Sequence, residues 1–100
     1  MSGIFQIEFT VEALEDLQSF RTYEQRQIVQ DIETQLSYQP AEQTRNRKQL
    51  RPNALAEWEL RSDKFRVFYD VEVEAAIVKI EAIGYKEGNQ LFIRGAEYEL

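Results

Sequence analysis

Basic residues gather in the middle of this 100-residue chain, although the chain as a whole is acidic. Between positions 45 and 66, seven basic residues stand against three acidic ones, which gives that window a charge of +4. The basic members are Arg45, Arg47, Lys48, Arg51, Arg61, Lys64 and Arg66. Because the net charge is −6, the remaining positions together carry −10. A local excess of this kind can attract a phosphate group while the rest of the surface repels it.

The residue types that are missing narrow the chemistry further. The sequence contains no Cys and no His, which excludes a disulfide, a thiolate nucleophile and an imidazole base. The carboxylates alternate with Arg and Lys instead of clustering, so we expect no metal and no other cofactor. No run of about 18 apolar residues is present, and the opening "MSGIFQIEFT" lacks the features of an export signal. We therefore expect no membrane span and a cytoplasmic location.

The elements that would position these residues are predicted from hydrophobic periodicity. Residues 4–9 alternate apolar and polar side chains, which indicates a half-buried strand. Thr10 is typical of a helix N-cap and precedes a first amphipathic helix. Thr22 and Gln25 have the spacing of a capping box and predict the start of a second helix, which Pro40 would terminate.

The second half of the chain has the pattern of a sheet. Residues 40–54 are polar and predict a loop. Strands are expected at residues 58–61, 64–71 and 77–83, where apolar and polar side chains alternate. Residues 85–90 are predicted to form a turn, and the following "LFIRG" suits either a short strand or an extended tail.

This order, β-α-α-β-β-β with a tail, predicts an α+β fold with two helices packed on one face of an antiparallel sheet. A chain of 100 residues has room for one modest core, so we expect a single domain spanning 1–100. The second face of the sheet then lies opposite the helices. It would carry Glu57, Glu59, Arg61, Arg66, Phe68, Lys79 and Glu81.

The register of the first hairpin decides which charges meet on this second face. A two-residue turn at 62–63 would place Leu60 opposite Phe65 and Glu59 opposite Arg66. In the simpler interpretation this is an ordinary cross-strand ion pair, which contributes about 0.2–1 kcal/mol. Phe68 and Phe92 do not suit a solvated face, however. Their cover could be the C-terminal tail, a partner chain or a stacked nucleobase.

Three segments together resemble the RelE/ParE superfamily of toxins from bacterial type II toxin–antitoxin pairs. These segments are "EFTVEALEDL" near the start, "NRKQLRPNALAEWELRSDKFRVFYDV" in the middle and "IEAIGYK" near the end. The similarity covers essentially the whole chain, and the predicted β-α-α-β-β-β order is that of the family. The hairpin that carries Arg66 is its most specific part.

The resemblance implies one of two activities and a protein partner. RelE-like members cut messenger RNA on the ribosome without a metal, because the ribose 2′-OH attacks its own phosphate. ParE-like members instead poison DNA gyrase. Both are held inactive by an antitoxin that wraps the toxin, so a cognate antitoxin is the expected partner.

Carried over residue by residue, the resemblance implies catalytic roles for a small set of side chains. Arg66 would contact the scissile phosphate. Arg61, which matches the family's basic residue at the close of the preceding strand, would also hold phosphate, and Lys86 would stabilise the developing charge. Glu57 and Glu59 stand where the family's prototype has two lysines. A positioned carboxylate can accept a proton, so Glu59 beside Arg66 is the candidate base for the 2′-OH.

Phe92 aligns with a tyrosine of the prototype and could stack on a base but could not transfer a proton. In this interpretation the residues that bind RNA or phosphate are Arg45, Arg47, Lys48, Arg51 and Phe92. The sequence thus predicts a ribosome-dependent messenger RNA endonuclease. The alternatives are a ParE-like gyrase poison, or an inactive toxin-like domain kept for antitoxin binding.

Overall fold

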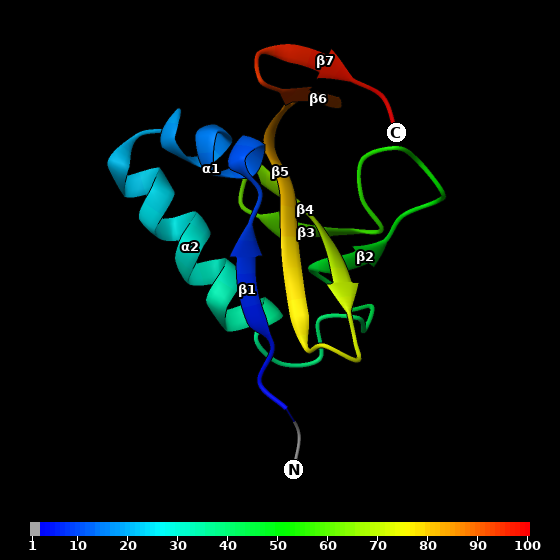
Figure 1. The fold of residues 1–100 in the computed structure, drawn as a ribbon. Helices are drawn as coiled ribbons and strands as arrows, with labels where there is room; N and C mark the ends of the chain where they lie inside the picture. Colours follow the sequence, from blue (N-terminus) through cyan, green and yellow to red (C-terminus); the bar gives the residue numbers. More distant parts are fainter. Residues whose placement is uncertain (1–2) are drawn as a thin grey trace.

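The computed structural model describes residues 3–100, which form two helices and one seven-stranded sheet (Figure 1). In chain order the elements are β1 (Gln6–Phe9), α1 (Val11–Gln18), α2 (Thr22–Leu36), β2 (Arg47–Gln49), β3 (Trp58–Ser62), β4 (Phe65–Glu72), β5 (Ile77–Glu87), β6 (Gln90–Ile93) and β7 (Ala96–Tyr98). Strands β2 to β7 follow one another across the sheet as antiparallel neighbours, whereas β1 runs parallel to β5. Both helices pack on one face, which confirms the predicted α+β class.

The two helices begin with different caps. Thr10 is the N-cap of α1, and its hydroxyl accepts a hydrogen bond from the Ala13 amide at 3.0 Å, as predicted. Thr22 and Gln25 do not form the predicted capping box of α2, because the N-cap is Arg21 and the residue that reaches back to it is Glu24. The Glu24 carboxylate accepts from the Arg21 backbone N–H at 3.1 Å. The side-chain amide of Gln25 instead donates to the Phe20 carbonyl, which lies in the turn before α2, at 2.8 Å.

The β3–β4 hairpin turns one residue later than predicted. Ser62 pairs with Phe65 and Leu60 with Val67, so the predicted pairing of Leu60 with Phe65 is wrong. The turn begins at Asp63, whose φ of 54° has the positive value that tight hairpin turns require. Each residue of β4 is therefore displaced by two positions relative to β3. An even displacement leaves every side chain on its predicted face.

A β-bulge at Glu81 changes the alternation along β5. Phe68 pairs with Ala82 and Tyr69 with Ile80, so Glu81 has no partner on β4. The alternation predicted for residues 77–83 therefore fails beyond this point. Ile83 joins the core beneath the helices, whereas Ala82 faces the opposite side beside Phe68.

Strand residues occur at three places where the sequence pattern predicted a loop, a turn or an undecided tail. β2 lies inside the segment 40–54, which was predicted to be a loop. β5 continues to Glu87, through much of the segment 85–90 that was predicted to be a turn. The tail is a hairpin of β6 and β7, which settles the choice between a strand and an extended segment.

This hairpin and the loop before β3 provide the cover for the second face. Phe68 is fully buried in a small apolar cluster with Ala82, Leu91 and Ile93. Leu50, Leu55 and Tyr98 pack around this cluster. The cover of Phe68 was predicted to be the C-terminal tail, a partner chain or a stacked nucleobase, and the C-terminal tail is part of the cover found.

A buried carboxylate fastens the hairpin to the first helix. Asp16 is 5% exposed, and its Oδ2 accepts a hydrogen bond from the Ile83 amide at 3.0 Å. Its Oδ1 lies 3.0 Å from Nε of Arg94, which sits in the β6–β7 turn. Burial raises the pKa of Asp16, and the hydrogen bond and Arg94 oppose that shift. Among residues 3–100, no helix is long and apolar enough to cross a membrane.

Candidate functional site

An ion pair between β3 and β4 lies at the centre of the second face. Nε of Arg66 is 3.6 Å from Oε2 of Glu59, and the two side chains are only 12% and 17% exposed. Nη1 of Arg66 also donates to the carbonyls of Asp63 and Phe65, at 2.8 and 2.9 Å. Burial lowers the pKa of Arg66, and Glu59 opposes this shift. The predicted partnership therefore exists, but it is diagonal, because Glu59 pairs directly with Phe68.

Three further cations surround this pair. Lys48 is directly opposite Glu59 on β2, and Arg61 is directly opposite Arg66 on β3. Lys86 comes from the far end of β5 and lines one open depression of about 410 Å³ together with Lys48 and Glu59. The structure thus brings the four predicted catalytic residues and Lys48 onto one surface.

The charge of this depression is nevertheless not basic. Lys48 and Lys86 are the cations that line it, whereas Glu59, Glu97 and Glu99 are the acids. Two of these acids, Glu97 and Glu99, come from the C-terminal hairpin region, whose structure the sequence pattern left undecided. Carboxylates outnumber cations, so the depression offers little net attraction to an anion.

Arg47 lies apart from this surface. It is opposite Leu60, on the helix side of the sheet, and is 9% exposed. Its Nη1 donates to the Gln35 carbonyl at 2.6 Å and its Nε to the Glu42 carbonyl at 3.0 Å. A cation at the last turn of a helix satisfies free carbonyls and complements the helix dipole. Arg47 therefore has a structural role, because it binds backbone carbonyls at and beyond the C-terminal end of α2.

Phe92 also lies away from Arg66. Its ring stacks on Tyr85 at a centroid distance of 5.5 Å, and Tyr85 in turn meets Phe20 edge-on. Leu91 and Ile93, on either side of Phe92, belong to the apolar cluster on the second face. Side chains alternate along a strand, so Phe92 points to the opposite side of β6.

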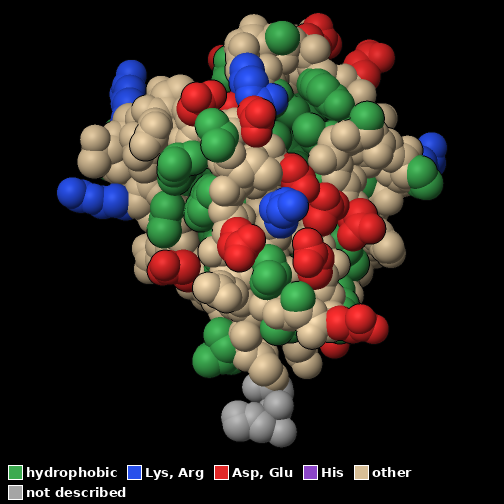
Figure 2. Space-filling view, in the orientation of Figure 1, with side chains coloured by type: hydrophobic (Ala, Val, Ile, Leu, Met, Phe, Trp, Pro, Cys, Tyr) green, Lys and Arg blue, Asp and Glu red, His purple; other side chains and the backbone are tan. Residues whose placement is uncertain are grey.

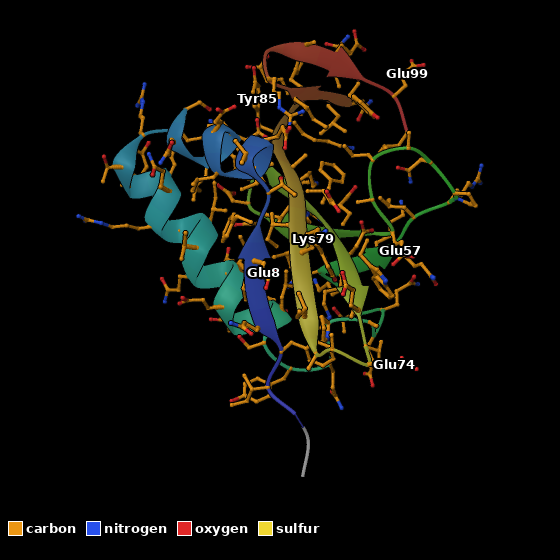
Figure 3. All side chains as sticks on the ribbon, viewed as in Figure 1. Glu8, Glu57, Glu74, Lys79, Tyr85 and Glu99 are labelled. Atoms are coloured by element: carbon orange, nitrogen blue, oxygen red, sulfur yellow. The ribbon has the colours of Figure 1, made fainter. Side chains whose placement is uncertain are left out.

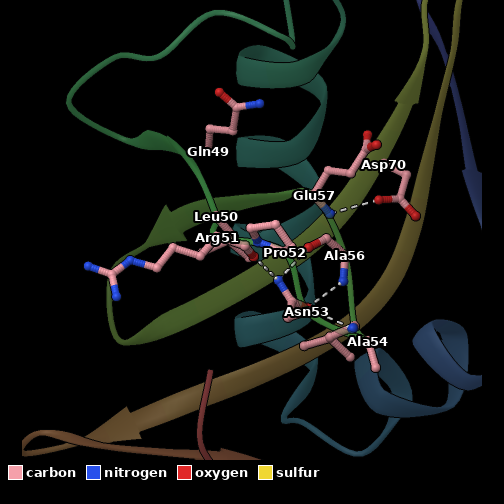
Figure 4. Close-up of a pocket in the computed structure, with 10 residues that line it drawn as sticks. Gln49, Leu50, Arg51, Pro52, Asn53, Ala54, Ala56, Glu57 and Asp70 are labelled. Carbon is pink, nitrogen blue, oxygen red and sulfur yellow. Dashed lines mark hydrogen bonds between the residues drawn. The ribbon is translucent and has the colours of Figure 1, made fainter.

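The remaining predicted phosphate ligands, Arg45 and Arg51, are exposed on the segments that flank β2. Arg51 is at the rim of a second depression of about 620 Å³, which the loop 50–56 forms in front of Asp70 (Figure 4). Asn53 organises this loop, since its side chain accepts from the amides of Leu55 and Ala56. The Pro-Asn pair in the sequence was a signal for such a turn.

Asp70 and Glu81 form a carboxylate pair that sequence reasoning missed. Burial and the adjacent Asp70 raise the pKa of Glu81 to about 7, and Lys79 opposes that shift. Asp70 also accepts a hydrogen bond from the Glu57 amide at 2.8 Å. Within the described residues, no group of three or more His, Cys, Asp or Glu side chains is arranged to hold a metal ion.

Comparison with known proteins adds independent information. A family model described as "ParE toxin of type II toxin-antitoxin system, parDE" matches residues 7–89. A solved chain from the toxin–antitoxin complex RelBE2 of Mycobacterium tuberculosis has the same fold, with a TM-score of 0.72 and 24% sequence identity. The match covers 84% of this chain and 93% of that chain. No curated protein sequence matches. The family match ends just before β6, so the C-terminal hairpin lies outside it.

Proposed function

The chain belongs to the ParE toxin family of type II toxin–antitoxin systems, and from this premise we propose that it acts by binding a protein target. It is the toxin of such a pair, and its partner is an antitoxin. In the proposal, the target is DNA gyrase, as in ParE-like members. The toxin then needs a complementary protein surface and no catalytic constellation.

The observation that carries this proposal is the charge of the depression beside the Glu59–Arg66 pair. Binding to RNA depends mainly on cations that neutralise backbone phosphates. Here the cations Lys48 and Lys86 face three carboxylates in the same depression. A phosphodiester entering it would meet net repulsion, whereas a protein surface with its own cations would not.

The state of Arg66 supports the same conclusion. Bidentate binding of a phosphate uses two parallel N–H groups of the guanidinium. In this chain Nη1 donates to two backbone carbonyls, and Nε faces Glu59. Bidentate contact with a phosphate would use Nη2 together with Nη1 or Nε, and it would therefore break at least one of these interactions. The proposal therefore assigns Arg66 to the support of the hairpin.

One observation favours the endonuclease as a second candidate. Glu59, Lys48 and Lys86 line the same depression, next to Arg66 and Arg61. If a messenger RNA on the ribosome displaced Arg66 from Glu59, the freed carboxylate could accept the 2′-OH proton. Lys86 would then stand near the developing charge.

The two candidates separate in parallel assays of gyrase supercoiling and cell-free translation. The proposal expects the purified toxin to inhibit supercoiling, leave translation unaffected and lose its effect when the antitoxin is added. Arrested translation with cleaved messenger RNA would overturn it, and Glu59→Gln should then abolish cleavage. Arg26→Ala is the matched control, because Arg26 is exposed on α2, away from the depression.

A further inference from the structure

The C-terminal hairpin region, residues 89–100, supplies most of the wall of the depression beside Glu59. Its strand β6 pairs with the end of β5, and β7 pairs with β6 and leads into Glu99. The matched family model ends at residue 89. This wall is therefore a feature that the family model does not describe, and its side chains can adapt the surface of this toxin to a particular partner.

The charged side chains of this wall are acidic. Glu97 and Glu99 line the depression from the C-terminal hairpin region, whereas Lys48 and Lys86 line it from β2 and β5. The remaining charged residue of the lining, Glu59, already has a cationic partner on β4. Within the lining, the two lysines are thus balanced by the two acids of the hairpin region. Without those acids, the depression would present two uncompensated cations.

The cations around Glu59 would then attract a nucleic acid. Arg61 is exposed beside the depression and lies directly opposite Arg66. Elsewhere the surface repels phosphate, since the net charge is −6 and acidic side chains surround one basic side chain at the centre of the face in Figure 2. Charges within about 10 Å, the Debye length at 0.1 M salt, act on a phosphate even without contact. The two acids of the hairpin region therefore decide whether a polyanion can approach this surface.

Three kinds of contact hold the C-terminal hairpin region in this position. Leu91 and Ile93 are buried in the apolar cluster on the second face. At Gly84 the backbone of β6 comes so close to β5 that a Cβ would clash with it. Nε of Arg94, in the β6–β7 turn, is 3.0 Å from Oδ1 of the buried Asp16 on α1. Because the region is packed and paired, the backbone that carries its two acids has a fixed place beside the depression.

We propose that the C-terminal hairpin region is a selectivity element, in which Glu97 and Glu99 exclude nucleic acid from the depression and reserve it for a protein segment that carries Lys or Arg. Arg94 is a positioning residue, since it holds the region against α1. The field that repels a phosphate also attracts a cationic side chain, so the same two acids serve both selections. The inference deepens the proposed function and rests on it for the nature of the target. The exclusion of nucleic acid is measured on the toxin alone.

Fluorescence anisotropy with a labelled single-stranded RNA measures this exclusion without any target protein. Both acids are exposed, so replacing them leaves the fold intact. The wild type should bind the probe weakly at low salt, and Glu97→Gln/Glu99→Gln should bind it at least about tenfold more tightly. The gain should shrink as salt rises, because binding to phosphates releases counterions. An unchanged affinity, or a wild type that already binds as tightly as the variant, overturns the selectivity element.

Glu72→Gln/Glu74→Gln is the matched control, because it changes the net charge by the same amount where β4 turns into β5. Figure 3 shows Glu74 at the opposite end of the sheet from Glu99. This control should leave the RNA affinity within about twofold of the wild-type value, since the charges are screened over that distance. Equal gains in the two double variants would show that net charge alone matters and would refute the role of the hairpin region.

Arg94→Gln tests the positioning role. The change removes a cation, so charge alone predicts weaker binding of RNA. The proposal predicts tighter binding, because a hairpin released from Asp16 takes its two acids away from the depression. Amide exchange in β6 and β7 should also become faster, and Arg94→Gln should add no further gain to Glu97→Gln/Glu99→Gln. Weaker binding of RNA, or unchanged exchange, would refute the positioning role.

Gyrase supercoiling assays separate this inference from the proposed function. If both hold, Glu97→Gln/Glu99→Gln should inhibit gyrase at least about tenfold more weakly than the wild type while it gains affinity for RNA. A wild-type toxin without effect on gyrase overturns the proposed function, and the anisotropy result still decides the exclusion of nucleic acid. A double variant that gains RNA binding but inhibits gyrase as strongly as the wild type refutes the reservation of the depression for a cationic segment.

Discussion

Replacement of Arg66 by Ala tests whether the Glu59–Arg66 pair supports the hairpin. The change removes two hydrogen bonds to the carbonyls of Asp63 and Phe65 and leaves the Glu59 carboxylate without its cation. Glu59 is 17% exposed, so water only partly replaces the lost partner. An exposed ion pair contributes about 0–1 kcal/mol, whereas breaking a buried one costs about 3–5 kcal/mol.

The geometry lies between these limits, and we expect Arg66→Ala to lower the free energy of unfolding by about 2 kcal/mol. For a domain of this size, the melting temperature should fall by about 8–16 °C. The assay is thermal and urea unfolding of the wild type, Arg66→Ala, Glu59→Gln and the double variant. Because Glu59→Gln removes the stranded charge, the double variant should be less destabilised than the two single variants together, by about 1 kcal/mol.

Arg61→Ala is the control, because Arg61 is the same residue type on the neighbouring strand but is exposed. Its effect should stay within about 0.5 kcal/mol. The reasoning is refuted if the effects of the Glu59 and Arg66 substitutions simply add, or if Arg66→Ala is as harmless as Arg61→Ala. In either case Arg66 would be free to bind a ligand.

Three other substitutions probe separate parts of the fold. Gly84→Ala should destabilise by about 1–3 kcal/mol in urea unfolding, because its Cβ would clash with the Phe92 carbonyl oxygen. The raised pKa of Glu81 contributes stability that is present below its ordinary value of 4.5 and is lost as pH rises through about 7. Glu81→Gln should therefore flatten the decline in melting temperature between pH 5 and 8, by the equivalent of about 1 kcal/mol. Asp16→Asn should weaken the tie to Arg94 and speed amide exchange in β6 and β7.

The fold class was predictable because it depends on the faces of the elements. Alternation in residues 4–9 and helical spacing after Thr10 were strong local patterns, and both elements are present. The hairpin register was not predictable, because a turn starting at Ser62 and one starting at Asp63 keep the same faces. The bulge at Glu81 was hidden as well, since apolar residues on both sides of it fit either face.

The candidate site was predictable to the same extent. Glu59, Arg61 and Arg66 share one surface because the error in register was an even number of residues. Arg47 was misplaced because its segment, without apolar alternation, gave no sign of being a strand with an inner face. The position of Phe92 depends on where β5 ends and the chain reverses, and a polar strand end resembles a turn in sequence.

The charge of the depression beside Glu59 also bears on how the antitoxin neutralises the toxin. The depression is lined by residues from β2, β3, β5 and the C-terminal hairpin region. Its three carboxylates outnumber Lys48 and Lys86, so Lys or Arg side chains of a bound protein would suit it better than acidic ones. In the proposed function the target needs this surface. An antitoxin segment with basic side chains would therefore compete with the target for the same depression.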